Sequence, residues 1–154
     1  MVGAAGVDPG LCIGSPELSV DGSVGLVSTE SGTWTVDVPS GRTTLVGQED
    51  RHALRDGHAL LAASGATEVR LVSLSTGEYS NVSVSGRVVD VTVVAGGYAL
   101  LTASGTAQFV DVLSEDGEWG RRMEVEGLFT SISGARDAHV AMVVAPSFFT
   151  KVEL

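Results

Sequence analysis

The sequence has little cysteine and few aromatic residues, and each shortage narrows the class of protein. Cys12 is the only cysteine, so no disulfide forms within the chain, and we expect Cys12 to be a small buried residue. Aromatic residues make up 5% of the chain. No stretch reaches membrane-spanning length without a glycine or a charge, so insertion into a membrane is not expected.

Positive charge is also scarce. The formal net charge is −10, and the eight arginines and the single lysine, Lys151, are scattered. Because no basic stripe is present to neutralise phosphates, nucleic acids and anionic membrane surfaces are not expected as partners. The first residues lack the basic and continuous apolar regions of a signal peptide, so we expect an intracellular location, cytoplasmic or inside an organelle.

What the chain does have is 20 glycines and an internal repeat. Residues 59–65 (ALLAASG) and 99–105 (ALLTASG) differ at one position and lie 40 residues apart. Residues 23–28 are a third copy and residues 138–144 a weaker fourth, and each copy follows a turn. A second segment with a shared ending comes downstream of each copy: 36–38, 72–74, 110–112 and 152–154.

The repeat unit contains four short strands separated by turns over about 40 residues, the period of a four-stranded propeller blade. Valine, leucine, isoleucine and threonine dominate these runs, as suits half-buried strands. We therefore predict one all-β domain over 1–154, a β-propeller-like array of about four blades. The repeats span approximately 12–47, 48–86, 87–126 and 127–154, and the last one is incomplete. Residues 48–54 are polar, and we expect no well-formed strand there.

The repeats resemble the WD-repeat family at residues 18–28 (LSVDGSVGLVS), 33–42 (TWTVDVPSGR) and 69–78 (VRLVSLSTGE). The resemblance covers roughly residues 12–154. Valine stands at 36, 72, 110 and 152 in place of the Trp of the Trp-Asp pair, and the Asp is kept only as Asp37 and Asp111. These departures imply degenerate blades that lack the family's Asp-His-Ser-Trp hydrogen-bond network. The resemblance implies a binding scaffold.

Three arrangements would complete an array whose last blade lacks a strand. The segment before Cys12 could add the strand and close a small ring, although its glycines and proline suit a loop better. Two copies could pair into an eight-bladed ring. Another chain, or a further part of a longer polypeptide, could supply the remaining blades. We favour the last two, because an unpaired strand edge invites a partner.

A search for chemical motifs predicts no catalytic residue, no cofactor and no metal site. His52, His58 and His139 are not at metal-ligand spacing with another ligand residue. Nucleophile-elbow and phosphate-binding motifs are absent from the sequence. The charged residues at 115–122 are interpreted as a solvated hairpin tip.

Three aromatic residues are predicted to contact a partner. Trp119 follows a charged turn and is the first candidate, because tryptophan is enriched at binding hot spots. Phe148 and Phe149 lie near the incomplete blade and could pack against whatever completes it. Trp34 lies inside a strand and is expected to pack within a blade.

Two classes of function compete. We predict a non-catalytic protein-protein interaction scaffold, a subunit or fragment of a propeller within a larger assembly, and not an enzyme. The alternative is a propeller enzyme or small-ligand-binding domain with a site near the ring axis, which requires polar groups from several blades. A different all-β fold, a sandwich or a barrel, is the remaining possibility.

Overall fold

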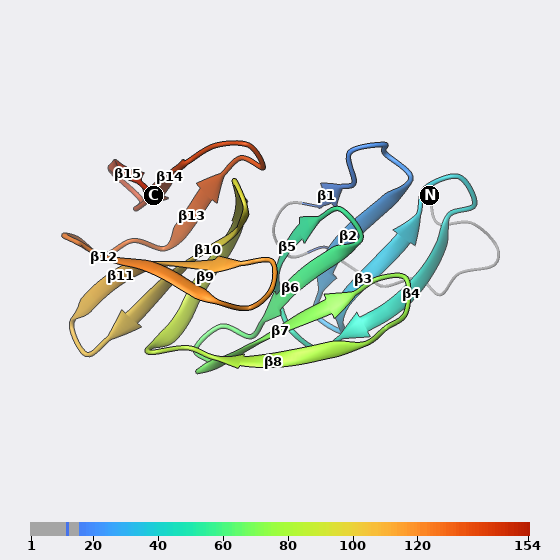
Figure 1. Ribbon diagram of the computed structural model, residues 1–154, viewed down its shortest axis with the longest axis horizontal. Coiled ribbons are helices and arrows are strands. Elements are labelled where there is room, and N and C mark those ends of the chain that lie inside the picture. The colour runs from blue at the N-terminus through green and yellow to red at the C-terminus, as the bar shows by residue number, and fades with distance from the viewer. Residues whose placement is uncertain (1–11, 13–15) are drawn as a thin grey trace.

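The computed structural model describes Cys12 and residues 16–154, and its described part consists of four antiparallel sheets without helices (Figure 1). We call the sheets blades 1 to 4, in chain order. Blade 1 holds β1 (Glu17–Leu18), β2 (Val24–Thr29), β3 (Gly32–Asp37) and β4 (Arg42–Gly47). Blade 2 holds β5 (Arg51–Arg55), β6 (His58–Ala62), β7 (Glu68–Ser73) and β8 (Tyr79–Ser83).

Blade 3 holds β9 (Arg87–Val94), β10 (Gly97–Ser104), β11 (Ala107–Ser114) and β12 (Trp119–Val125). Blade 4 has three strands, β13 (Ser131–Gly134), β14 (Val140–Val144) and β15 (Phe149–Glu153). The predicted all-β array of four propeller blades is confirmed, including the three-stranded last blade.

Within every blade the strands pair in chain order, so each blade is an antiparallel meander. The first strands of neighbouring blades contact one another, β1 with β5, β5 with β9 and β9 with β13. These strands therefore line the axis of the array, and the later strands lie toward its rim. Figure 1 shows the blades as an open arc, with blade 1 and blade 4 at its two ends.

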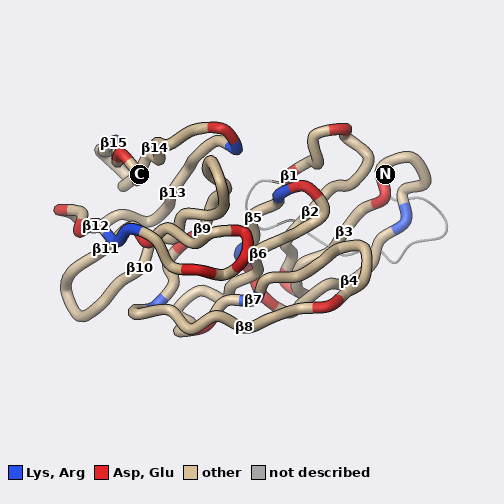
Figure 2. Tube along the Cα trace, viewed as in Figure 1, with Lys and Arg blue, Asp and Glu red and all other residues tan. Residues whose placement is uncertain are grey.

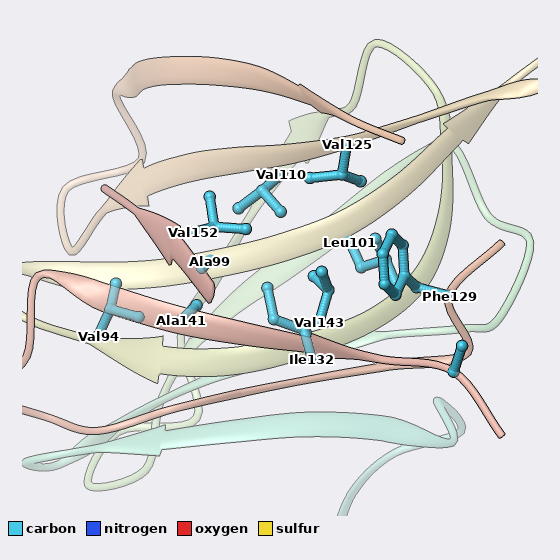
Figure 3. Packing of buried hydrophobic residues seen from close by; sticks show 11 residues of the cluster. Val94, Ala99, Leu101, Val110, Val125, Phe129, Ile132, Ala141, Val143 and Val152 are labelled. Atoms are coloured by element: carbon cyan, nitrogen blue, oxygen red, sulfur yellow. The ribbon is translucent and has the colours of Figure 1, made fainter. Parts of the chain in front are cut away.

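Three apolar clusters hold consecutive blades together. Leu26 of blade 1 packs with Leu54, Ala59, Leu61 and Val72 of blade 2. Blades 2 and 3 share a second cluster around Leu60, Ala62, Val88, Tyr98, Leu100 and Leu113. Blades 3 and 4 share a third, shown in Figure 3, in which Leu101, Val110, Ile132 and Val143 meet. Burial on both faces explains why residues 59–62 of β6 and 98–101 of β10 are apolar without alternation.

Two expectations from the sequence are wrong. Residues 51–55, inside and just after the segment expected to be poorly formed, make strand β5, because Ala53 and Leu54 are buried against blades 3 and 1. Of the polar residues in this segment, Asp50, Arg51 and His52 lie at the axis, and Glu49 pairs with Arg70 of the same blade. Cys12 is exposed rather than buried, and it forms an isolated antiparallel bridge with Thr29 at the edge of β2.

Two blade faces lie at the ends of the arc. Side chains alternate along each strand, so the residues between those that pack on a neighbouring blade form the opposite face. The blade 1 end face consists of Leu18, Gly25, Val27, Trp34, Val36, Thr43 and Leu45. The blade 4 end face consists of Ser131, Ser133, Val140, Met142, Val144, Phe149, Lys151 and Glu153.

Candidate functional site

A pocket of about 700 Å³ lies on the axis, where the first strands of all four blades converge. Its lining alternates apolar residues with charged ones. The ionisable side chains are Glu17, Asp50, Arg51, His52, Asp90 and Arg136. Because they come from every blade, the array brings together charges that are far apart in the sequence.

Glu17 joins blade 1 to blade 2. Its Oε2 accepts a hydrogen bond of 2.7 Å from the backbone N–H of Leu54, and its Oε1 lies 4.0 Å from Nε2 of His52. Burial raises the pKa of Glu17 to about 7, against the lowering effect of the Leu54 hydrogen bond and of Arg136. The carboxyl group therefore changes charge near neutral pH.

Asp90 makes the corresponding contact between blades 3 and 4. Its Oδ2 accepts a 2.9 Å hydrogen bond from the backbone N–H of Ile132, while its Oδ1 lies 3.8 Å from Nε of Arg51. Burial raises the pKa of Asp90 as well, and the backbone hydrogen bonds and Arg51 act in the opposite direction. Two residues further along β9, the Thr92 hydroxyl accepts a 3.0 Å hydrogen bond from the N–H of Gly134.

Two arginines tie the blades together at one end of the pocket. Arg136, after β13, donates to the carbonyl of Leu18 at 3.1 Å and pairs with Asp56 at 3.3 Å, so blade 4 contacts blades 1 and 2. Arg55 donates to the carbonyl of Val94 and forms an ion pair with Glu115. The hairpin tip at 115–118 is therefore not simply solvated as expected, because Glu115 binds blade 2.

A buried polar chain that the sequence did not predict lies between blades 1 and 2. The Ser28 hydroxyl is 2.6 Å from Nδ1 of His52 and 2.7 Å from the hydroxyl of Thr33, which donates to the carbonyl of Glu49. The Ser28 hydroxyl, the His52 imidazole and the Glu17 carboxylate are therefore neighbours in a row. Ser28 is 2% exposed, so its hydroxyl is shielded from any substrate in the pocket.

The three predicted partner contacts are not brought together in one site. Trp119 is the first residue of β12 and is 40% exposed, and its indole N–H donates to the carbonyl of Ser83 at 3.0 Å. It therefore links blade 3 to blade 2. Phe148 packs edge-on against Phe129, with ring centroids 5.3 Å apart. Phe149 lies on the blade 4 end face and is 66% exposed.

The remaining candidates lie as follows. Trp34 is half-buried on the blade 1 end face and donates to the Ser31 hydroxyl at 3.2 Å. His58 begins β6, and His139 immediately precedes β14; both are exposed. In the described part of the chain, no three His, Cys, Asp or Glu side chains are close enough to hold a metal ion. No described helix could cross a membrane.

The charged residues of the pocket could not be identified as a group from the sequence, because they come from different blades. One signal was present: Asp90 is the single charged residue inside the apolar run 88–94. A charge in a strand that is otherwise buried needs a partner, and that partner is the backbone of the next blade. Basic and acidic residues are interspersed along the described chain, without a basic stripe (Figure 2).

No protein-family model matches the sequence, and no curated protein matches it either. Solved structures do resemble it. Hydrazine synthase of Kuenenia stuttgartiensis matches with a TM-score of 0.72 and 13% identity, covering 88% of this chain and 44% of that one. The Cps50 (Swd1) β-propeller domain of Myceliophteria thermophila matches with a TM-score of 0.62 and 12% identity, covering 91% and 53%.

The WD40 repeats of RRP9 match with a TM-score of 0.62 and 8% identity, covering 83% of this chain and 43% of that one. The chain therefore spans about half the length of each of these three structures, or somewhat less. Since an enzyme and WD40 repeats are both among them, the likeness is one of fold. The chain has the β-propeller fold that WD40 repeats and hydrazine synthase share.

Proposed function

We propose that the chain is a non-catalytic protein-protein interaction scaffold that contributes its four blades to a larger assembly. The blade 4 end face carries this proposal. Met142 and Phe149 are 38% and 66% exposed there, whereas Leu60 and Leu101, on the corresponding faces of blades 2 and 3, are fully buried. Exposed apolar side chains grouped on one sheet face are typical of a surface that binds another protein.

The bonding of the axial groups supports the same proposal. Glu17, Asp90 and Thr92 each use an oxygen atom to bind the backbone of the following blade. Such bonds satisfy backbone N–H groups at the free edge of the inner strand, which would otherwise lack hydrogen-bond partners. These side chains therefore have a structural task. The similarity to the RRP9 WD40 repeats and the Cps50 propeller domain is consistent with a scaffold.

A comparison of partner recovery tests the proposal. The tagged wild-type chain and the Phe149→Glu variant are purified from the cells of its source, and the recovered proteins are compared. Tyr79→Glu is the matched control, because Tyr79 is 62% exposed but lies on β8, away from both end faces. We expect at least one protein to be lost with Phe149→Glu and kept with Tyr79→Glu. Identical recovery from all three chains would overturn the proposal.

A second candidate function is binding of a small ligand in the axial pocket. It is favoured by the pocket of about 700 Å³, in which carboxylates, arginines and a histidine converge from four blades. A thermal-shift screen of small polar metabolites tests it. A ligand that stabilises the wild type and fails to stabilise Glu17→Gln and Asp90→Asn would establish this function, and a screen without such a ligand argues against it.

A further inference from the structure

The two end faces continue the series of contacts that joins the blades. On the face directed toward the preceding blade, the second strands of blades 2 and 4 carry a small residue and then, two positions later, a larger one, whereas blade 3 carries Tyr98 and Leu100 there. The small and larger residues are Ala59 and Leu61 in blade 2 and Ala141 and Val143 in blade 4. Blade 1 carries Gly25 and Val27 at the matching positions of its end face. The blade 1 end face thus matches the faces with which blades 2 and 4 pack on a preceding blade, although no blade precedes it among the described residues.

The blade 4 end face matches the opposite side of such a contact. On β9, Asp90 and Thr92 face the next blade and accept N–H groups of its inner strand. On β13, Ser131 and Ser133 are likewise two residues apart, and both lie on the blade 4 end face. An inner strand packed against blade 4 would thus find two hydroxyl acceptors beside Met142 and Val144.

Charge allows the two end faces to meet. The chain has a net charge of −10, but the blade 1 end face contains no charged residue. The blade 4 end face carries Lys151 and Glu153, which form an ion pair with each other. Contact between the two faces therefore brings no like charges together, despite the acidity of the whole chain. Both faces also expose apolar groups, since Leu18 and Leu45 are 59% and 41% exposed on blade 1.

We propose that the blade 4 end face of one copy packs against the blade 1 end face of a second copy, and that two such junctions close a ring of two chains. The proposal rests on the scaffold function and names its partner. Each junction is head-to-tail, so the two-fold symmetry of the pair produces two identical junctions and leaves no end face open. Two copies also supply about the length of the solved propeller chains, of which this chain covers 43 to 53% in the three structures described above.

The mass of the chain in solution is the first test. Light scattering at tens of micromolar is expected to give twice the 15.8 kDa of one chain. Met142→Glu damages one side of the junction and Leu45→Glu damages the other. Each places a charge in an apolar contact, and each is expected to weaken the dimer by about 100-fold or more. Tyr79→Glu should remain dimeric. Circular dichroism confirms that each variant keeps its strands.

Mixing the two damaged variants gives the decisive result. The intact blade 4 end face of the Leu45→Glu chain can pack on the intact blade 1 end face of the Met142→Glu chain, so the mixture regains one good junction and part of the dimer. Rescue on mixing supports the head-to-tail junction. A dimer of Leu45→Glu alone, or the absence of rescue, would overturn it, because either result means that other surfaces pair.

A monomeric wild type, or an open polymer larger than a dimer, would also overturn the two-chain ring. Neither result decides the scaffold function, which is tested separately by the loss of a recovered protein from Phe149→Glu. A monomeric chain that still loses a different protein with Phe149→Glu would keep the scaffold and replace the second copy with that protein.

Discussion

Leu60 and Leu100 occupy the same position of the two nearly identical heptapeptides, yet they meet in one cluster from opposite sides of the interface between blades 2 and 3. The turn glycines explain this relationship. Gly57 and Gly96, at φ of 71° and 74°, immediately precede strands β6 and β10 and are 39 residues apart, whereas the heptapeptides are 40 apart. A shift of one residue turns every side chain of a strand to its other face.

The shared cluster predicts that these two leucines are coupled energetically. Leu60→Ala and Leu100→Ala should each lower the free energy of unfolding by about 2–5 kcal/mol, because both side chains are fully buried. The double variant should differ from the sum by about 0.5–3 kcal/mol. Urea unfolding monitored by circular dichroism measures all three. Leu26→Ala, in a different cluster, combined with Leu100→Ala is the control and should be additive within about 0.5 kcal/mol.

Glu17 should make the fold less stable as pH rises through neutrality. Its pKa is about 7 in the folded chain against 4.5 as a model value, so the folded state holds the proton more tightly. The stabilisation is complete below pH 4.5 and is lost as pH rises through 7. The shift corresponds to at most about 3 kcal/mol, and we expect less because the side chain is 30% exposed.

Glu17→Gln should flatten this dependence, since glutamine has no proton to lose. Chemical denaturation at pH 5, 6, 7 and 8 measures it. Glu118→Gln is the control, because Glu118 is exposed at the hairpin tip, and it should retain the slope of the wild type. Equal slopes for wild type and Glu17→Gln would contradict the assignment of the raised pKa to Glu17.

The Asp111 carboxylate should be essential to the stability of blade 3. It accepts a 2.6 Å hydrogen bond from Thr102 and pairs with Arg122 at 3.1 Å, and its side chain is 6% exposed. Asp111→Ala leaves the buried Thr102 hydroxyl and the Arg122 charge without this partner, at a cost of about 3–5 kcal/mol. Thermal and urea unfolding report the loss. Asp116→Ala, at an exposed position, should change stability by less than about 0.5 kcal/mol.

Trp119 should contribute to stability through its indole N–H. Trp119→Phe keeps an aromatic ring and removes the donor to the carbonyl of Ser83, so it should cost about 0.5–1.5 kcal/mol. Urea unfolding followed by circular dichroism is the measurement. An unchanged midpoint would show that the hydrogen bond adds nothing, and Trp119 would then be left with the role of partner contact predicted from the sequence.

The sequence revealed the blades but not how their faces pack. Strand-turn-strand units are visible because glycine turns alternate with short apolar runs such as 91–94. The direction in which a side chain faces depends on the exact turn residue, as the 39-residue spacing of Gly57 and Gly96 shows. The heptapeptides, which are 40 residues apart, align the two strands one residue out of this register. A repeat found by residue identity is therefore a poor guide to which side chain meets which neighbour.

The axial pocket could not be predicted from the sequence for a different reason. Glu17, His52 and Asp90 are separated by about 35 to 40 residues and belong to no motif of fixed spacing. Each lies within the first strand of a different blade, and only the stacking of these inner strands brings them to one cavity. Their chemistry is a property of the assembled array rather than of any one repeat.

The bonds between inner strands also have a direction along the chain. Glu17, Arg55, Asp90 and Thr92 each lie on an earlier blade and bind backbone atoms of the later one. During synthesis from the N-terminus, each emerging blade therefore meets a folded surface whose side chains are already placed to receive its edge. Arg136 follows the last of these inner strands in the chain and binds back to blades 1 and 2, so it joins the start of blade 4 to the first two blades before β14 and β15 are made. The growing chain can thus use each completed blade as the template for the next.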